Sequence, residues 1–136
     1  MRKHRISALI ALMLCLPLTM LAKVEHLLPK VHTLNVANGL PFALQRTVTI
    51  TDENNTAALK KVFTDYGCTI ESGAAATVTV EMVESIEGAY DYTLVGYDNE
   101  GYQLTVMENA IVIKAVKPIG VIRAAQTLAQ LAEGYE

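Results

Sequence analysis

The chain has 136 residues and a formal net charge of −3, and 51% of its residues are hydrophobic. That length suits one domain with a hydrophobic core of its own. Because the chain is acidic and has no basic stripe, its composition argues against nucleic acid or an anionic membrane surface as partner.

The N-terminus has the layout of a secretory signal peptide. Three basic residues precede an apolar run over residues 6–21, and Ala22 follows it. Cleavage after Ala22 would divide the chain into a signal peptide, 1–22, and one exported domain, 23–136, destined for the periplasm or the extracellular space. A membrane anchor is the first alternative, but a proline interrupts the run, which is shorter than the roughly 20 apolar residues of a spanning helix. A lipid-modified Cys15 is the second, disfavoured because no small residues precede it.

The first half of the mature chain predicts strands and then a helix. The expected extended segments are 32–36, 41–44 and 46–51, with a turn at Asn38 and Gly39. Residues 52–67 predict a helix whose apolar stripe comprises Leu59, Val62, Phe63 and Tyr66. Asp52 or Asn54 is expected to cap this helix, and Gly67 to close it in a left-handed conformation. Asn54, Asn55 and Thr56 also match a glycosylation sequon, which we interpret as capping chemistry because such short patterns arise often by chance.

The second half predicts two short strands, a hairpin and a second helix. The expected strands are 68–71 and 77–83, and the hairpin joins 102–106 to 110–115 through a turn at Glu108 and Asn109. Pro118 fits the first position of the helix and Gly134 its C-terminal cap. The helix face expected to be buried comprises Ile119, Ile122, Ala125, Leu128 and Ala132. The residues expected on an exposed or barrel-facing surface are Arg123, Gln126, Thr127 and Gln130.

Side chains that could carry chemistry are few. Cys68 is the only cysteine after residue 22, so we expect no intramolecular disulfide and a buried, inert thiol. His32 reads as a strand-surface residue rather than a ligand. Tyr90, Tyr92, Tyr97 and Tyr102 form a cluster that could stack on sugars, although strand spacing favours buried rings. With no metal, phosphate or nucleophile motif in the sequence, we nominate no catalytic, cofactor-binding or metal-binding residue and expect no cofactor.

The hairpin and the helix after it carry one family resemblance. The segments NEGYQLTV, NAIVIKA and PIGVIRAAQTLAQL, in that order, resemble the end of the N-terminal, non-catalytic α+β domain of family 20 glycoside hydrolases, the β-N-acetylhexosaminidases, especially secreted Bacteroidetes-type members. The resemblance is strongest over Asn99 to Leu131 and runs collinearly back to Leu28. Lys117 departs from the pattern, because a small polar residue is the better cap before Pro118.

The resemblance implies a function for the whole protein rather than for these residues alone. In the family the matching helix leads into a catalytic (β/α)₈ barrel, which would be the intramolecular partner of this domain. The intact enzyme would release terminal N-acetylglucosamine or N-acetylgalactosamine from glycans without a metal or organic cofactor. Family members use an Asp-Glu pair for catalysis, but Asp52 and Glu53 lack the surrounding glycine-rich motif, so helix capping is favoured for them. We therefore expect this chain alone to be inactive.

The sequence thus predicts an α+β domain, in which a mixed or mostly antiparallel sheet carries two helices packed on one face. Two alternatives for its function remain. The chain could be a free-standing secreted module that makes weak glycan contacts. It could also be the equivalent domain of another glycosidase, an α-N-acetylglucosaminidase or an α-glucuronidase.

Overall fold

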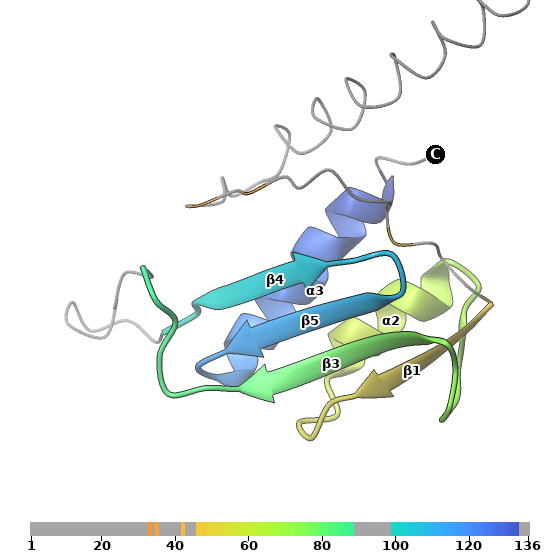
Figure 1. Ribbon diagram of the computed structural model, residues 1–136, viewed down its shortest axis with the longest axis horizontal. Helices are drawn as coiled ribbons and strands as arrows, with labels where there is room; N and C mark the ends of the chain where they lie inside the picture. Colours follow the sequence, from red (N-terminus) through yellow and green to blue (C-terminus); the bar gives the residue numbers. More distant parts are fainter. Residues whose placement is uncertain (1–32, 34, 36–41, 43–45, 89–98, 134–136) are drawn as a thin grey trace, which may run out of the picture. The chain divides into compact units, whose positions relative to one another are not determined.

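A computed structural model describes residues 33, 35, 42, 46–88 and 99–133 (Figure 1). The chain divides into two compact units, one spanning Ala37–Ala129 and the other Met1–Val36 with Gln130–Glu136. Of the second unit the structure describes only residues 33, 35 and 130–133. The fold below is therefore that of the first unit, with the last turn of its C-terminal helix.

The described elements alternate between strands and helices. In chain order they are β1 (Thr47–Thr51), α2 (Ala57–Asp65), β2 (Thr69–Ile70), β3 (Ala76–Met82), β4 (Tyr102–Val106), β5 (Ala110–Ala115) and α3 (Pro118–Glu133). The sequence predicted each of them to within two residues at most boundaries, including the turn at Glu108 and Asn109 and Pro118 at the start of α3. The predicted strands over 32–36 and 41–44, the Asn38–Gly39 turn and the Gly134 cap lie wholly or mostly outside the described residues.

The described strands form one five-stranded sheet in the order β2-β1-β3-β5-β4. The pairs β1–β2, β1–β3 and β3–β5 are parallel, and β4–β5 is antiparallel. The prediction of a mixed sheet is confirmed, but the expectation that it would be mostly antiparallel is wrong. The one hairpin predicted among these strands, 102–106 with 110–115, is the antiparallel pair β4–β5, whereas α2 returns the chain so that β2 runs parallel to β1. The domain is therefore better described as α/β.

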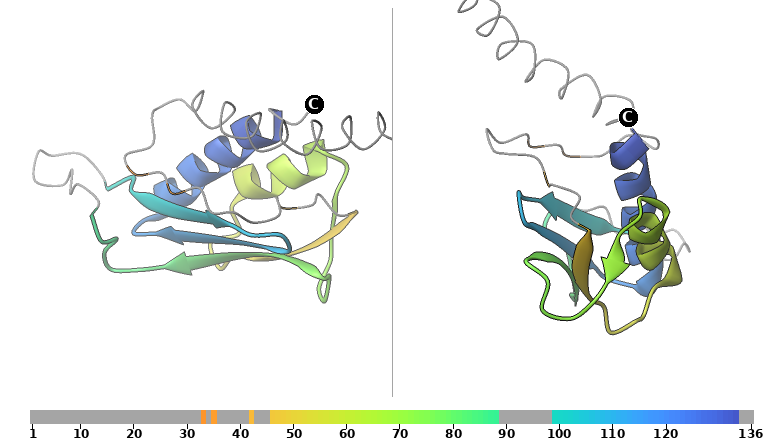
Figure 2. Two further views of the ribbon diagram at one scale, coloured as in Figure 1. Left: turned by 45° about the horizontal axis from the view of Figure 1, so that its top comes forward. Right: turned by 90° about the vertical axis from the view of Figure 1, so that its right-hand side faces the viewer.

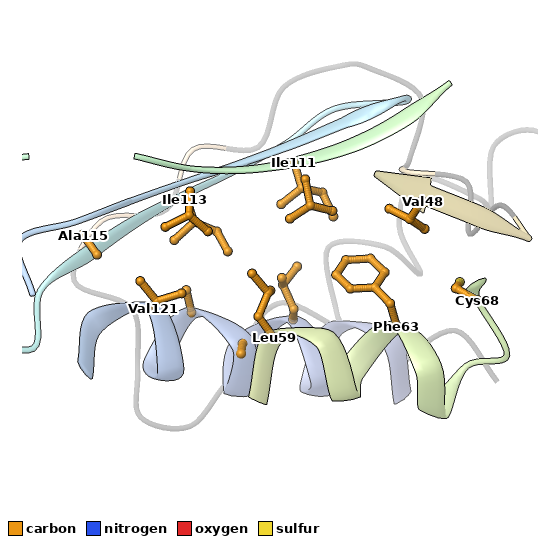
Figure 3. Packing of buried hydrophobic residues seen from close by; sticks show 13 residues of the cluster. Val48, Leu59, Phe63, Cys68, Ile111, Ile113, Ala115 and Val121 are labelled. Carbon is orange, nitrogen blue, oxygen red and sulfur yellow. The ribbon is translucent and has the colours of Figure 1, made fainter. Parts of the chain in front are cut away.

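Both helices cover the same face of the sheet (Figure 2). The alternation of β3 explains why, because Ala76, Val78 and Val80 are buried while Thr77 and Thr79 between them are partly exposed. Figure 3 shows the resulting core, in which strand side chains meet residues of α2 and α3. Its largest fully buried side chains are Phe63, Leu59, Ile113, Val48, Val78 and Val121. The two helices lie on one face of the sheet, as predicted, and bury the apolar sides of β1, β3 and β5.

Helix α2 confirms the predicted stripe in part. Leu59 and Phe63 are buried, whereas Val62 and Tyr66 are only half-buried. Its C-terminus ends as expected at Gly67, which has φ +78°. The Cys68 N–H donates to the Phe63 carbonyl at 2.9 Å and the Gly67 N–H to the Thr64 carbonyl at 3.0 Å. These two bonds form a Schellman motif, which satisfies carbonyls that the helix leaves without partners.

Helix α3 is rotated relative to the prediction. Ala125 and Leu128 are buried as expected, but Ile119, Ile122 and Ala132 are only half-buried. The remaining buried positions are Gly120, Val121, Ala124 and Thr127. The prediction followed the three-to-four spacing that starts at Ile119, whereas the structure turns the neighbouring face, with Gly120, Val121 and Ala124, toward the sheet. The placement of Thr127 on the exposed face was wrong for this reason.

Candidate functional site

One open depression lies where the parallel strands β1 and β2 end. It has a volume of about 480 Å³ and is lined by Thr49, Ile50, Thr51, Asp52, Glu53, Ile70, Glu71 and Ser72. The carboxyl ends of parallel strands are a common place for ligands in open α/β sheets. The chemistry of this depression therefore depends on whether its carboxylates are available.

The Asp52 carboxylate is committed to the loop between β1 and α2. It accepts hydrogen bonds from the backbone N–H of Asn54 at 3.0 Å and of Thr56 at 2.8 Å, one on each oxygen. The Asn55 N–H donates to the Asp52 carbonyl at 3.0 Å, and Asn55 itself has φ +52°. Asp52 thus shapes a tight loop, which is a structural role.

The cap of α2 differs from the expectation that Asp52 or Asn54 would occupy it. The N-cap residue is Thr56, and its side chain makes no capping hydrogen bond. The Asp52 carboxylate instead accepts a hydrogen bond from the Thr56 backbone N–H and so holds the N-cap residue in place. Glu53 beside it is exposed. None of the described hydrogen bonds joins the side chain of Asp52 or Glu53 to another acidic side chain. The pair therefore lacks the arrangement of a general acid with an orienting partner.

Thr49 holds the opposite wall of the depression. Its hydroxyl donates to the Glu71 carbonyl at 2.9 Å and accepts from the Ala74 N–H at 2.8 Å. One hydroxyl on β1 therefore forms hydrogen bonds near both ends of the loop that joins β2 to β3. No local sequence pattern marks this contact, because Thr49 looks like any outward-facing strand residue.

The N-terminal half of α3 packs closely against the residues just before β4. A Cβ added to Gly120 would lie only 2.6 Å from the Gly101 carbonyl oxygen. The Tyr102 hydroxyl and the Thr127 hydroxyl are 2.5 Å apart and share a hydrogen bond. Thr127 is 8% exposed, so this bond satisfies the only buried polar side chain of the described core. The spacing of Gly120, Ala124 and Thr127 is the sequence signal for this approach, because small residues repeat along one helix face.

An ion pair reinforces the same junction. The Arg123 Nε lies 2.7 Å from a Glu100 carboxylate oxygen, and Arg123 also contacts the Gln126 side chain at 3.2 Å. The hydrogen bond from Arg123 lowers the pKa of the Glu100 carboxyl, and Glu100 in turn raises the pKa of Arg123. Both side chains remain partly exposed, so the pair orients the loop more than it stabilises the fold.

The tyrosine cluster is described at one position only. Tyr90, Tyr92 and Tyr97 lie outside the described residues, and the hydroxyl of half-buried Tyr102 is engaged with Thr127. Tyr102 therefore supports the expectation of a buried ring rather than a sugar platform.

The cysteine matches its prediction, and the other predicted chemistry stays a prediction. Cys68 forms no disulfide, 7% of its surface is exposed, and burial raises the pKa of its thiol. Within residues 46–88 and 99–133 and the isolated described positions, no group of three His, Cys, Asp or Glu side chains is placed to hold a metal ion. No helix in the described part of the chain is long and apolar enough to cross a membrane. The predicted signal peptide over 1–22, with Cys15, and the histidines fall outside that part.

Comparison with known proteins gives one match. A family model described as "Glycosyl hydrolase family 20, domain 2" matches residues 25–136. No curated protein matches the chain. The matched region covers all the described elements, including the junction of α3 with the residues before β4.

Proposed function

Since the chain belongs to glycosyl hydrolase family 20 as its domain 2, the accessory domain of β-hexosaminidases, we propose that it is the structural N-terminal domain of an exported β-N-acetylhexosaminidase. A (β/α)₈ barrel typically needs about 250 residues, so the catalytic barrel is absent from these 136 residues. The parent enzyme would remove terminal N-acetylhexosamine from glycans, and this domain would pack against its barrel.

The observation that supports a structural role is the junction of α3 with the residues before β4. Gly120, the ion pair of Arg123 and the buried Thr127 all fix the same helix face, so α3 leaves the sheet in one defined direction. A helix held at several points can orient the domain that follows it. In contrast, the Asp52 carboxylate in the depression already accepts hydrogen bonds from two backbone N–H groups.

The helix layer is the surface we assign to the barrel. On the side of α3 opposite to its buried positions, Ile119 and Ile122 are half-buried beside half-buried Arg123 and Gln130 and exposed Gln126. Apolar side chains with a polar and charged margin are the composition expected of an interface. The other face of the sheet carries threonines and the paired charges of Lys114 and Glu81, 3.6 Å apart.

Activity and stability measurements on residues 23–136, with and without the barrel of a family 20 enzyme fused after Glu136, would test this proposal. The domain alone should fold cooperatively and should not hydrolyse an aryl N-acetyl-β-glucosaminide. In the fusion, Ile122→Glu should lower the unfolding temperature of the barrel, whereas Lys114→Glu on the other face serves as the matched control and should not. Turnover by the domain alone that is abolished by Asp52→Ala or Glu53→Ala would overturn the structural assignment.

The glycan-binding alternative makes a different prediction for the same domain. It requires saturable binding of N-acetylglucosamine or chitobiose that is lost when Tyr92 and Tyr97 are replaced by alanine. The structural proposal expects no saturable binding in a calorimetric titration. The engaged hydroxyl of Tyr102 favours the structural proposal at the one position of the cluster that is described.

A further inference from the structure

In the sequon Asn54-Asn55-Thr56, the two defining side chains, those of Asn54 and Thr56, make none of the described hydrogen bonds. Interpreting it as capping chemistry requires Asn54 or Thr56 to bond the first turn of α2. The Thr56 side chain makes no such bond, and Asp52 provides the side-chain acceptor for this loop. Among the described hydrogen bonds, Asn55 accepts from the Lys60 ammonium group and so does have a partner, whereas the Asn54 amide and the Thr56 hydroxyl have none.

Asn54 is also accessible. It is exposed, and it lies in a turn after the end of β1 and before the first residue of α2, outside both elements. An acceptor for N-linked glycosylation must have the form Asn-x-Ser/Thr with x other than proline, on a surface loop. This is the only place in the 136 residues where that pattern occurs.

From these observations we propose that Asn54 accepts an N-linked glycan when the chain passes through a compartment that contains an oligosaccharyltransferase and a lipid-linked oligosaccharide. The Asn54 Nδ2 forms a bond to the anomeric carbon of the sugar, and the bond from that carbon to the lipid pyrophosphate breaks. The pyrophosphate leaves with the electron pair, and the amide gives one proton to a base of the transferase. The proposal rests on entry into such a compartment and is independent of the glycosidase function.

The glycan would extend from one rim of the depression at the ends of β1 and β2. Asp52 and Glu53, the two residues before Asn54, both line that depression. Because the Asp52 carboxylate clamps the backbone of Asn54 and Thr56, the folded loop is held in a turn. Loosening this clamp with Asp52→Ala should raise the glycosylated fraction, since the transferase must bind the acceptor segment in its own cleft.

The test is secretion of the full chain, behind a host leader, from a eukaryotic cell, followed by intact-mass measurement of the secreted fraction. We expect one added oligosaccharide that N-glycosidase removes, leaving Asn54 converted to Asp in the corresponding peptide. Asn54→Gln and Thr56→Ala should abolish the added mass. Thr56→Ser should retain it, and Asn55→Gln, the neighbouring amide, is the matched control that should also retain it.

Two results would overturn the proposal. One is a secreted wild-type chain that carries no glycan, because secretion shows that it passed the transferase. The other is an added oligosaccharide that persists in Asn54→Gln. Neither result bears on hexosaminidase activity, since the measurement involves no glycan hydrolysis.

Discussion

Replacing Gly120 by alanine tests the close approach of α3 to the residues before β4. The added Cβ would lie 2.6 Å from the Gly101 carbonyl oxygen, 3.1 Å from the Ala115 Cβ and 3.4 Å from the Glu100 carbonyl oxygen. The first of these is roughly 1 Å shorter than an ordinary contact between non-bonded heavy atoms. Because the nearest atom belongs to the backbone, no side chain can rotate away, and either α3 or the loop must move.

Two effects of opposite sign determine the outcome. Alanine is favoured over glycine in a helix by about 1 kcal/mol, which would stabilise the variant. Forcing extra volume into a packed site costs about 1–3 kcal/mol, and a clash with backbone belongs at the upper end. We therefore expect a net loss of about 1–2 kcal/mol in the free energy of unfolding, or a fall of about 5–10 °C in Tm for a domain of this size.

Urea and thermal unfolding of residues 23–136, followed by circular dichroism, would measure this loss. Gln126→Ala, on an exposed position of the same helix, is the control and should change the free energy by less than about 0.5 kcal/mol. A Gly120→Ala variant as stable as the wild type or more stable would refute the close approach.

Three further predictions concern other contacts of the same domain. Leu128, which is 6% exposed, should lose about 2–5 kcal/mol on replacement by alanine, and a loss as small as that of Gln126→Ala in urea unfolding would mean that α3 is rotated differently. Thr49→Val should cost about 1–3 kcal/mol and raise amide exchange at Ala74, because it removes the partner of that N–H; unchanged exchange would contradict the role of the hydroxyl. Because Arg123 lowers the folded-state pKa of Glu100, the ion pair stabilises the fold above the ordinary glutamate pKa of about 4.3 and loses that effect as the pH falls through the lower folded value. The small difference in Tm between wild type and Glu100→Gln should therefore vanish as the pH is lowered, and a difference that grows would contradict the pairing.

The sequence predicted the elements of this fold well because local signals specify them. Alternation of apolar residues identified β3, and Gly67 and Pro118 marked a helix end and a helix start. The pairing of the strands was predicted less well, since alternation says which face of a strand is buried but not which strand lies beside it. A return through α2 gives a parallel neighbour, and nothing in the residues of β2 itself distinguishes that from a hairpin.

The candidate site shows the same division. That Cys68 is buried and forms no disulfide was predicted from the sequence. The contacts of Thr49 with Glu71 and Ala74, and of Tyr102 with Thr127, join residues more than twenty positions apart and depend on the tertiary fold. The rotation of α3 was missed because its apolar residues fit more than one three-to-four stripe, and the contribution of Gly120, which packs closely against the loop before β4, depends on the tertiary fold.

The order of the strands has a consequence for how the chain folds as it is synthesised. The central strand β3 pairs on one side with β1, through partners such as Val48 and Ala76, and on the other with β5, through partners such as Thr77 and Ala110. Among the described strands only β4 and β5 pair across a short turn, and they are nearly the last to leave the ribosome. Non-local pairings form slowly because a long loop must close before any contact is made. The central strand β3 therefore lacks its neighbour β5, and the apolar face of the sheet lacks α3, until Ala115 and the helix that follows have emerged.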